Sequence, residues 1–216
     1  MISSKSIMPE WEDIFEEQGR VFTEPHQDME WVVQVFQEYQ VRRVLDVGCG
    51  SGRHLVYLSK RGFETYGFDI SQRALSLAQE WLQEEGLHSA IIEHRMEERF
   101  PYDDAFFDAV VSTQVIHHNR MSEILFTVSE IERVLRSGGI LFVSFPRLSG
   151  VPSEGDKDWE LEQIEPGTYI PRSGPEAGIA HHYFTEDETY KVFANFDIQS
   201  IHMDETNHRC VLGIKR

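Results

Sequence analysis

Residues 44–54 have the sequence VLDVGCGSGRH, in which a short apolar run leads into a turn that contains three glycines. The apolar and β-branched residues suit a buried parallel strand, and glycines at a sharp bend let a ligand approach the backbone closely. Asp46 adds a carboxylate beside this turn. The segment therefore predicts a strand, a cradle for a nucleoside cofactor and the start of a helix.

The spacing of the glycines distinguishes between cofactor classes. A dinucleotide fingerprint has the pattern Gly-x-Gly-x-x-Gly, whose last glycine lets the helix pack closely on the strand. Here Gly48, Gly50 and Gly52 alternate, and Arg53 occupies the position of that last glycine. The pattern disfavours a nicotinamide-dependent oxidoreductase and leaves backbone amides that could bind a sugar or an amino-acid carboxylate.

A second carboxylate follows a second strand-like run. Residues 64–68 have the sequence ETYGF and lead directly into Asp69. An acid about twenty residues beyond the glycine turn is in the usual position to bind ribose hydroxyls. Two acids at the ends of adjacent strands indicate an adenosine.

Four motifs resemble those of the class I S-adenosylmethionine-dependent methyltransferases, in particular small-molecule enzymes with a type 11-like domain. They lie at residues 46–52, 67–71, 100–102 with 107–111, and 132–139. The resemblance covers most of the chain from about Trp11 onward. Four motifs in order and at suitable separations are hard to obtain by chance, so the resemblance implies a methyltransferase.

Alternating strand and helix patterns predict an α/β fold with a mostly parallel sheet. Strands are expected at residues 41–47, 64–68, 90–93, 107–112, 140–145, 196–202 and 209–214. Helices are expected at residues 8–18, 28–39, 53–60, 72–85, 121–135 and 185–194, with Ser71 as an N-cap. The last two strands have too little chain between them for a helical crossover, which predicts an antiparallel hairpin. The resemblance implies a Rossmann-like, doubly wound seven-stranded sheet of order 3-2-1-4-5-7-6 with the last strand antiparallel.

The length of 216 residues fits a single methyltransferase domain, residues 1–216. Within it we expect an N-terminal helical cap at residues 1–40. Residues 146–184 interrupt the strand and helix rhythm with prolines, glycines and acids. An irregular insertion after the fifth strand lies at the carboxyl edge of the sheet, where ligands bind, which predicts a substrate lid, with a plain surface loop as the alternative.

The formal net charge of −17 disfavours a nucleic-acid partner, because binding to phosphate backbones depends on clustered Lys and Arg. Of the two cysteines, Cys49 lies inside the glycine turn, where a disulfide would distort the backbone. This favours a reducing cytoplasm. No secretory signal and no apolar run of about twenty residues is present, so we expect a cytoplasmic protein without a membrane partner. The sequence leaves the oligomeric state open.

The resemblance implies that the cofactor is S-adenosyl-L-methionine and assigns residues to its parts. Gly48 and Gly50 would let the backbone approach the amino-acid portion, and Asp46 would bind its ammonium or orient the turn. Asp69 would accept hydrogen bonds from both ribose hydroxyls.

Further cofactor contacts follow from the same resemblance. Ile70 would pack on the adenine face, while Met96 and Glu97 would lie along the adenine edge. The family often has an acid at the position of Met96, so here a backbone amide or Glu97 would make that contact. Gln114 would face the methionine end, and Arg53 would pair with the cofactor carboxylate or else be exposed.

Two histidine pairs are candidates for chemistry. His117 and His118 follow the fourth strand, whereas His181 and His182 close the insertion. Neighbouring residues on a strand face opposite sides, so at most one residue of each pair should reach a shared cleft. We expect His117 and His181 to act as a base or to orient the acceptor, with structural hydrogen bonds as the alternative for the other two. Imidazoles could also meet around a metal, but no spacing specifies a ligand set and no metal is expected.

The predicted function is in-line methyl transfer to a small-molecule acceptor, for which the protein aligns the acceptor and excludes water. Aromatic residues, which are otherwise core residues, are candidates for the acceptor pocket: Trp11, Phe15, Phe22 and Tyr183. Oxygen, nitrogen, sulfur and metalloid acceptors all remain open. The alternative function is a non-catalytic partner subunit or sensor that binds S-adenosylmethionine.

Overall fold

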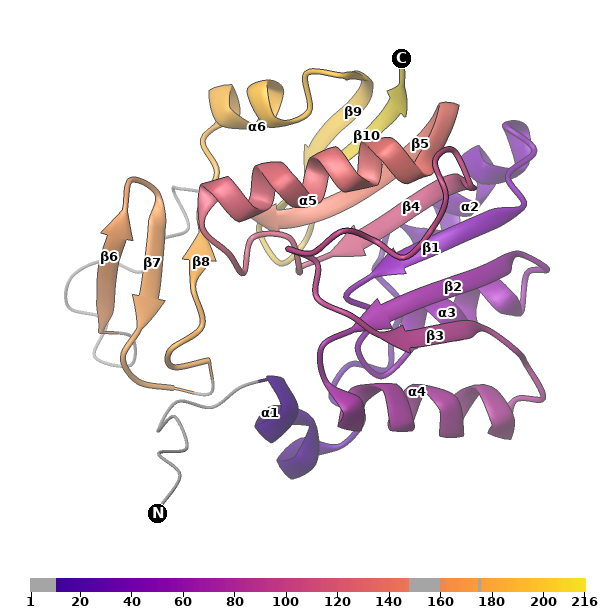
Figure 1. Ribbon diagram of the computed structural model, residues 1–216, viewed down its shortest axis with the longest axis horizontal. Coiled ribbons are helices and arrows are strands. Elements are labelled where there is room, and N and C mark those ends of the chain that lie inside the picture. The colour runs from indigo at the N-terminus through magenta and orange to yellow at the C-terminus, as the bar shows by residue number, and fades with distance from the viewer. Residues whose placement is uncertain (1–10, 148–159, 175) are drawn as a thin grey trace.

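The apolar run before the glycine turn forms β1 (Arg43–Val47), an inner strand of a seven-stranded sheet (Figure 1). The computed structural model describes residues 11–147, 160–174 and 176–216. The other strands of this sheet are β2 (Glu64–Asp69), β3 (Ala90–Glu93), β4 (Phe107–Thr113), β5 (Leu135–Pro146), β9 (Phe196–Met203) and β10 (His208–Lys215). Their spatial order is β3-β2-β1-β4-β5-β10-β9. Since β9 and β10 are the sixth and seventh strands of this sheet along the chain, the expected Rossmann-like order is confirmed.

The strand directions also agree with the prediction. β1 pairs in parallel with β2 on one side and with β4 on the other. β10 runs antiparallel to both β5 and β9, which confirms the predicted hairpin. The connection between β9 and β10 is a tight turn, in which the Asp204 carboxylate accepts hydrogen bonds from the backbone N–H groups of Thr206 and His208.

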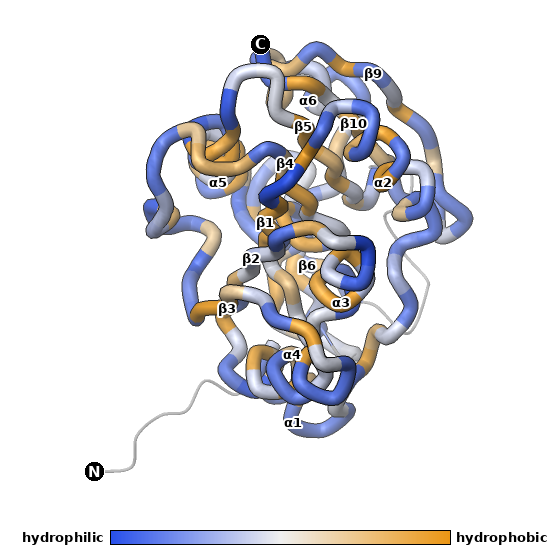
Figure 2. Tube along the Cα trace, turned by 90° about the vertical axis from the view of Figure 1, so that its right-hand side faces the viewer, coloured by the Kyte–Doolittle hydropathy of each residue, from blue (hydrophilic) through white to orange (hydrophobic). Residues whose placement is uncertain are grey.

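Helices cover both faces of the sheet. The helices of the described chain are α1 (Trp11–Gln18), α2 (Met29–Glu38), α3 (Arg53–Ser59), α4 (Gln72–Glu84), α5 (Met121–Val134) and α6 (Glu186–Val192). Along β1, Leu45 and Val47 pack into the core under α5 and α6, whereas Val44 packs into the core under α2 and α3. This alternation is the period of a strand that is buried on both sides. Figure 2 shows the resulting hydrophobic interior between polar outer segments.

The insertion after β5 contains regular structure. Its described part forms a second sheet of three antiparallel strands, β6 (Leu161–Glu165), β7 (Thr168–Pro171) and β8 (His181–His182). The expectation of an irregular segment is therefore wrong for these residues. The Pro166-Gly167 dipeptide, a turn signal, marks the hairpin between β6 and β7. Residues 148–159 of the expected lid lie outside the described residues.

The helix α1 is attached to the beginning of α4. Ser71 caps α4 as predicted, because its Oγ accepts a hydrogen bond of 2.9 Å from the Ala74 N–H. The same Oγ donates to the Glu12 carboxylate of α1 at 2.6 Å, and that carboxylate also accepts from the Arg73 N–H. Residues 1–10 of the expected N-terminal cap lie outside the described residues. None of the helices in the described chain is both long and apolar enough to cross a bilayer.

Gly52, at the end of the glycine turn, provides a test of how closely this turn packs against α4. Its φ of +91° lies in the left-handed region, and a Cβ there would come within 2.9 Å of the Ala78 Cβ of α4. Gly62 has a similar φ of +86° but no atom near its would-be Cβ. Gly62→Ala should lower the free energy of unfolding by about 1 kcal/mol from backbone strain alone, and Gly52→Ala by about 2 kcal/mol or more from strain plus overlap. Urea unfolding measures both, and equal losses would contradict the packing argument.

Candidate functional site

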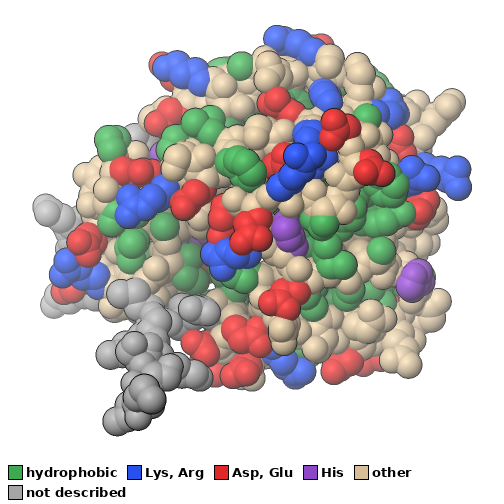
Figure 3. Space-filling model, viewed as in Figure 1, with side chains coloured by type: hydrophobic (Ala, Val, Ile, Leu, Met, Phe, Trp, Pro, Cys, Tyr) green, Lys and Arg blue, Asp and Glu red, His purple; other side chains and the backbone are tan. Residues whose placement is uncertain are grey.

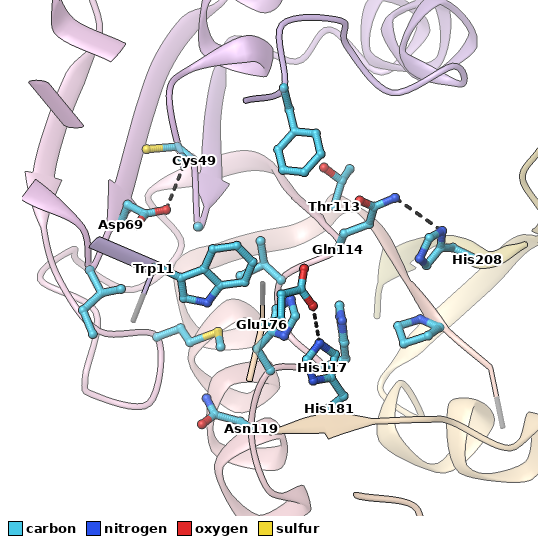
Figure 4. A pocket seen from close by; sticks show the side chains of 18 of the residues that line it. Trp11, Cys49, Asp69, Thr113, Gln114, His117, Asn119, Glu176, His181 and His208 are labelled. Carbon is cyan, nitrogen blue, oxygen red and sulfur yellow. Dashed lines mark hydrogen bonds and ion pairs between the residues drawn. The ribbon is translucent and has the colours of Figure 1, made fainter. Parts of the chain in front are cut away.

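A cavity of about 430 Å³ opens at the carboxyl ends of β1, β2 and β4. The predicted cofactor residues in its wall are Gly48, Gly50, Arg53, Asp69, Ile70, Met96, Glu97 and Gln114. His117 and His181 line the same cavity (Figure 4). The structure therefore brings these predicted cofactor residues, but not Asp46, into one space with His117 and His181.

The glycine turn is fastened to the end of β2. The N–H groups of Gly48 and Cys49 both donate to the Phe68 carbonyl, at 3.0 and 2.9 Å. Gly48 and Gly50 have φ of +71° and +51°, and a Cβ at Gly48 would overlap the side chain of Val115. Because glycine has no side chain, the backbone at Gly48 and Gly50 leaves room for a ligand to approach closely.

Asp69 lies at the centre of the cradle and is almost fully buried. One of its carboxylate oxygens accepts from the Gly50 N–H at 2.8 Å, and the other accepts from the Ser71 N–H at 3.0 Å. Burial raises the pKa of Asp69, and these backbone hydrogen bonds oppose that rise. A carboxylate has about four acceptor positions, so each oxygen can accept a further hydrogen bond.

Asp46 lies behind the turn and does not belong to the described cavity wall. Its Oδ2 is buried without a hydrogen-bond partner among the described residues and lies 3.8 Å from Nδ1 of His54. Burial raises the pKa of Asp46 to about 7, against the opposing charge of Arg53. An unpaired buried carboxylate oxygen beside a cradle fits a ligand that carries an ammonium group.

Arg53 is fixed at the cavity wall and is not a free surface residue. Its guanidinium donates to the Thr113 hydroxyl at 3.2 Å and lies over the ring of Phe22. Gln114 has a φ of +60°, a rare conformation for a residue with a side chain, and its amide nitrogen lies 3.3 Å from Nδ1 of His208. Both side chains thus line the cavity, Arg53 from the start of α3 and Gln114 from the residue after β4.

At the other end of the cradle, Ile70 is 40% exposed although it is apolar. Met96 packs against the core with its side chain and accepts a hydrogen bond from Thr127 through its carbonyl. The Glu97 carboxylate forms an ion pair with Arg95. Ile70 and Met96 therefore offer an apolar surface of the kind on which a flat ring packs, and Glu97 lies beside it.

Three histidines converge in the wall of the cavity. The ring centroids of His117 and His118 are 3.8 Å apart. The centroid of His181 lies 5.7 Å from that of His117 and 4.6 Å from that of His118. The expectation of one cavity residue per pair is wrong for the first pair, because these residues lie in the turn after β4 and not on a strand. It agrees with the second pair, since His182 is fully buried and bonded to the Thr168 hydroxyl outside the cavity wall.

Burial and neighbouring charges determine the protonation of this group. Burial lowers the pKa of His117 well below its ordinary value, and the neighbouring imidazoles lower it further. Burial likewise lowers the pKa of His118 to about 3, with a contribution from His181. Both rings are therefore neutral near pH 7.

The sequence alone did not indicate Glu176, which belongs to this group. Its Oε2 lies 2.6 Å from Nε2 of His181, whose Nδ1 bonds the Ile179 carbonyl at 2.9 Å. Burial raises the pKa of Glu176, but the hydrogen bond from His181 and nearby imidazoles bring it below the usual range. An acid five residues before a histidine in an acid-rich insertion gave no signal that separates it from its neighbours.

The aromatic candidates Trp11, Phe15, Phe22 and Tyr183 all line the cavity. Trp11 contacts the His118 ring edge-on, with centroids 5.0 Å apart. Phe15 also packs against α4, so it belongs to a small core as well as to the wall. The helix α1 thus closes one side of the cavity above the histidines.

Comparison with known proteins gives consistent matches. Residues 45–143 match a family model described as a methyltransferase domain. A ubiquinone biosynthesis O-methyltransferase of Alkalilimnicola ehrlichii is 30% identical over 116 residues, which cover 54% of this chain and 46% of that protein. The uncharacterized methyltransferase YcgJ of Bacillus subtilis is 28% identical over 120 residues, or 56% of this chain and 46% of that protein. The chain spans about half the length of these curated relatives.

Solved structures share the fold. The PH0226 protein of Pyrococcus horikoshii superposes with a TM-score of 0.73 at 19% identity, covering 93% of this chain and 99% of that one. A SAM-dependent methyltransferase of Methanosarcina mazei superposes with a TM-score of 0.71 at 22% identity, covering 84% and 96%. The family model over residues 45–143 and the methyltransferase relatives support the resemblance of this chain to the class I S-adenosylmethionine-dependent methyltransferases, and the solved structures share its fold.

Proposed function

We propose that this protein transfers a methyl group from S-adenosylmethionine to a small-molecule acceptor. The observation that carries the proposal is the continuity of one cavity, which extends from the glycine turn and Asp69 to the histidine group. A cofactor in the cradle and an acceptor beside the histidines would share this space. Two reactants in one enclosed site are what an in-line displacement requires.

The residues at the cradle fit the parts of this cofactor. The free acceptor positions on Asp69 suit ribose hydroxyls, and Ile70 with Met96 suits the adenine face, with Glu97 at its edge. The unpaired Oδ2 of Asp46 suits an ammonium group, reached through water because Asp46 lies behind the described wall. 

At the methionine end, Gly48 and Gly50 let the backbone approach, while Arg53 and Gln114 supply polar groups. When bound, the cofactor supplies a methyl group already activated on a sulfonium.

The remaining work of the protein is to orient the acceptor and exclude water. Both ring nitrogens of His181 have partners, so its geometry favours an orienting role. His117 is neutral and its Nδ1 has no partner among the described residues, which leaves it able to accept a proton from the acceptor. Trp11 and Tyr183 would exclude water above them.

Several observations support a small acceptor in the cytoplasm. The described parts of the N-terminal cap and of the insertion at residues 146–184 form part of the cavity wall, which favours a small acceptor and a covering role for the insertion. On the face shown in Figure 3, Lys and Arg are scattered among Asp and Glu and form no single patch for nucleic acid. Both cysteines are free and buried, which favours a reducing compartment.

The relatives named as O-methyltransferases favour an oxygen acceptor.

Asp69→Asn tests the cofactor assignment. The substitution keeps the size of the side chain but replaces charged acceptors by a weaker one, so S-adenosylmethionine should bind about 10-fold more weakly or worse. Isothermal titration calorimetry measures the affinity. Asp103→Asn, which changes an exposed acid outside the described wall, should leave it unchanged. Absence of binding by folded wild-type protein would overturn the proposal.

The raised pKa of Asp46 predicts pH-dependent cofactor binding. An ammonium group binds the ionised carboxylate, so below pH 7 binding must first displace a proton. The affinity for S-adenosylmethionine should reach a plateau above pH 7 and fall toward about tenfold per unit below it. Calorimetry across this range checks the slope. The dependence should be reduced in Asp46→Asn, and in wild-type protein titrated with 5′-methylthioadenosine, which lacks the ammonium group.

Turnover is tested directly with labelled S-adenosylmethionine and a panel of hydroxyl, amine and thiol acceptors. Formation of S-adenosylhomocysteine together with a labelled acceptor is the expected result. Trp11→Ala should lower kcat/KM because water enters the cavity, while cofactor affinity changes less. Tight cofactor binding without turnover on any acceptor would favour a binding subunit or sensor instead.

A further inference from the structure

We propose that His117, His118 and His181, together with Glu176, bind a divalent cation such as Zn²⁺ at the acceptor end of the cavity. One potential ligand atom from each histidine lies within 4.8 Å of the others. Imidazole nitrogens and a carboxylate are ligands that Zn²⁺ prefers in catalytic sites, where one coordination position stays open. The spacing of these four residues along the sequence does not predict a metal site.

Unpartnered atoms on two of these rings support the site. Nδ1 of His117 and Nδ1 of His118 are buried and have no hydrogen-bond partner among the residues that the structure describes. In folded proteins the large majority of buried polar side-chain atoms have such a partner. The two unpartnered nitrogens on neighbouring rings are therefore available to bind a ligand.

The contacts of His181 point in the same direction. The Ile179 carbonyl can only accept a hydrogen bond, so the Nδ1 of His181 carries a proton. Its Nε2 forms a hydrogen bond of 2.6 Å with the Glu176 carboxylate, so a cation bound to both atoms would take the place of the proton between them. A histidine held by a backbone carbonyl through one nitrogen, with its other nitrogen toward the cation, is the usual arrangement at metal sites.

A second group of possible ligands serves as an internal comparison. It consists of two overlapping sets that share Cys210, namely His26 with Asp204 and Asp28 with His202. There the groups bond one another, with His26 Nε2 at 3.1 Å from Asp204 and His202 Nε2 at 2.8 Å from Asp28. These side chains form hydrogen bonds with one another without a cation, and they do not line the cavity that contains the predicted cofactor residues. The geometry therefore favours the histidines of the cavity.

The chemical consequence rests on the proposed function. A cation at this position would bind an oxygen of the acceptor and favour loss of its hydroxyl proton to solvent, as metal-bound water loses a proton at lower pH than free water. The acceptor class that fits is a hydroxyl compound that can also bind a metal. His117 and His181 would then orient the acceptor through the cation.

The test uses the full chain, freed of metal by dialysis against a chelator and titrated with Co²⁺ as a spectroscopic probe. We expect visible absorption bands of Co²⁺ bound by nitrogen ligands, which Zn²⁺ then abolishes by displacement. His118→Gln and His181→Gln should each weaken Zn²⁺ binding by more than about 100-fold, since even changes behind a ligand cost about 10–100-fold. His202→Gln removes an imidazole from the comparison group and should leave the affinity unchanged.

The outcomes separate this proposal from the proposed function. Wild-type protein that binds S-adenosylmethionine but neither Co²⁺ nor Zn²⁺ would overturn the metal site and leave methyl transfer standing. Loss of metal binding in His202→Gln, with retention in His118→Gln, would also overturn it. Metal binding without cofactor binding would instead overturn only the proposed function. Circular dichroism and S-adenosylmethionine titration of each variant verify that it is folded.

Discussion

The carboxylate of Asp69 connects the parts on which the rest of the site depends. One oxygen accepts the N–H of Gly50 in the turn after β1, and the other accepts the N–H of Ser71 at the start of α4. Ser71 in turn bonds Glu12, so α1 is joined to the same point. Asp69, at the end of β2, thus holds the glycine turn, which forms the base of the cavity. Through Ser71 it also holds α1, which forms one wall.

This arrangement explains how much of the fold and cradle can be predicted from sequence. Glycines at positions 48 and 50 are needed because the backbone there has positive φ, and a side chain at Gly48 would overlap Val115. Asp69 and Ser71 follow the end of a strand and precede a helix, where acids and caps have local reasons to occur. Such requirements arise within a few residues of chain, so they leave a recognisable pattern.

The acceptor end could not be predicted in the same way. The contact between Glu176 and His181 depends on the path of an insertion. The contact of His181 with His118 joins β8 to the turn after β4, which is far from it in the chain. The strand rule misled for His118 because the chain leaves β4 before it reaches this residue. Similarly, the burial of Asp46 behind the turn is a property of the packed sheet and has no local signature.

The two ends of the cavity therefore have different structural origins. Turns between strands of the central sheet form the proposed cofactor end, whereas the segment that contains β6, β7 and β8 contributes the Glu176 and His181 side of the proposed acceptor end. The hydrogen-bond partners of Asp69, Gly50 and Ser71, lie outside that segment. A protein with this sheet can therefore come to modify a different molecule through changes in one inserted segment, without changes in the residues around Asp69.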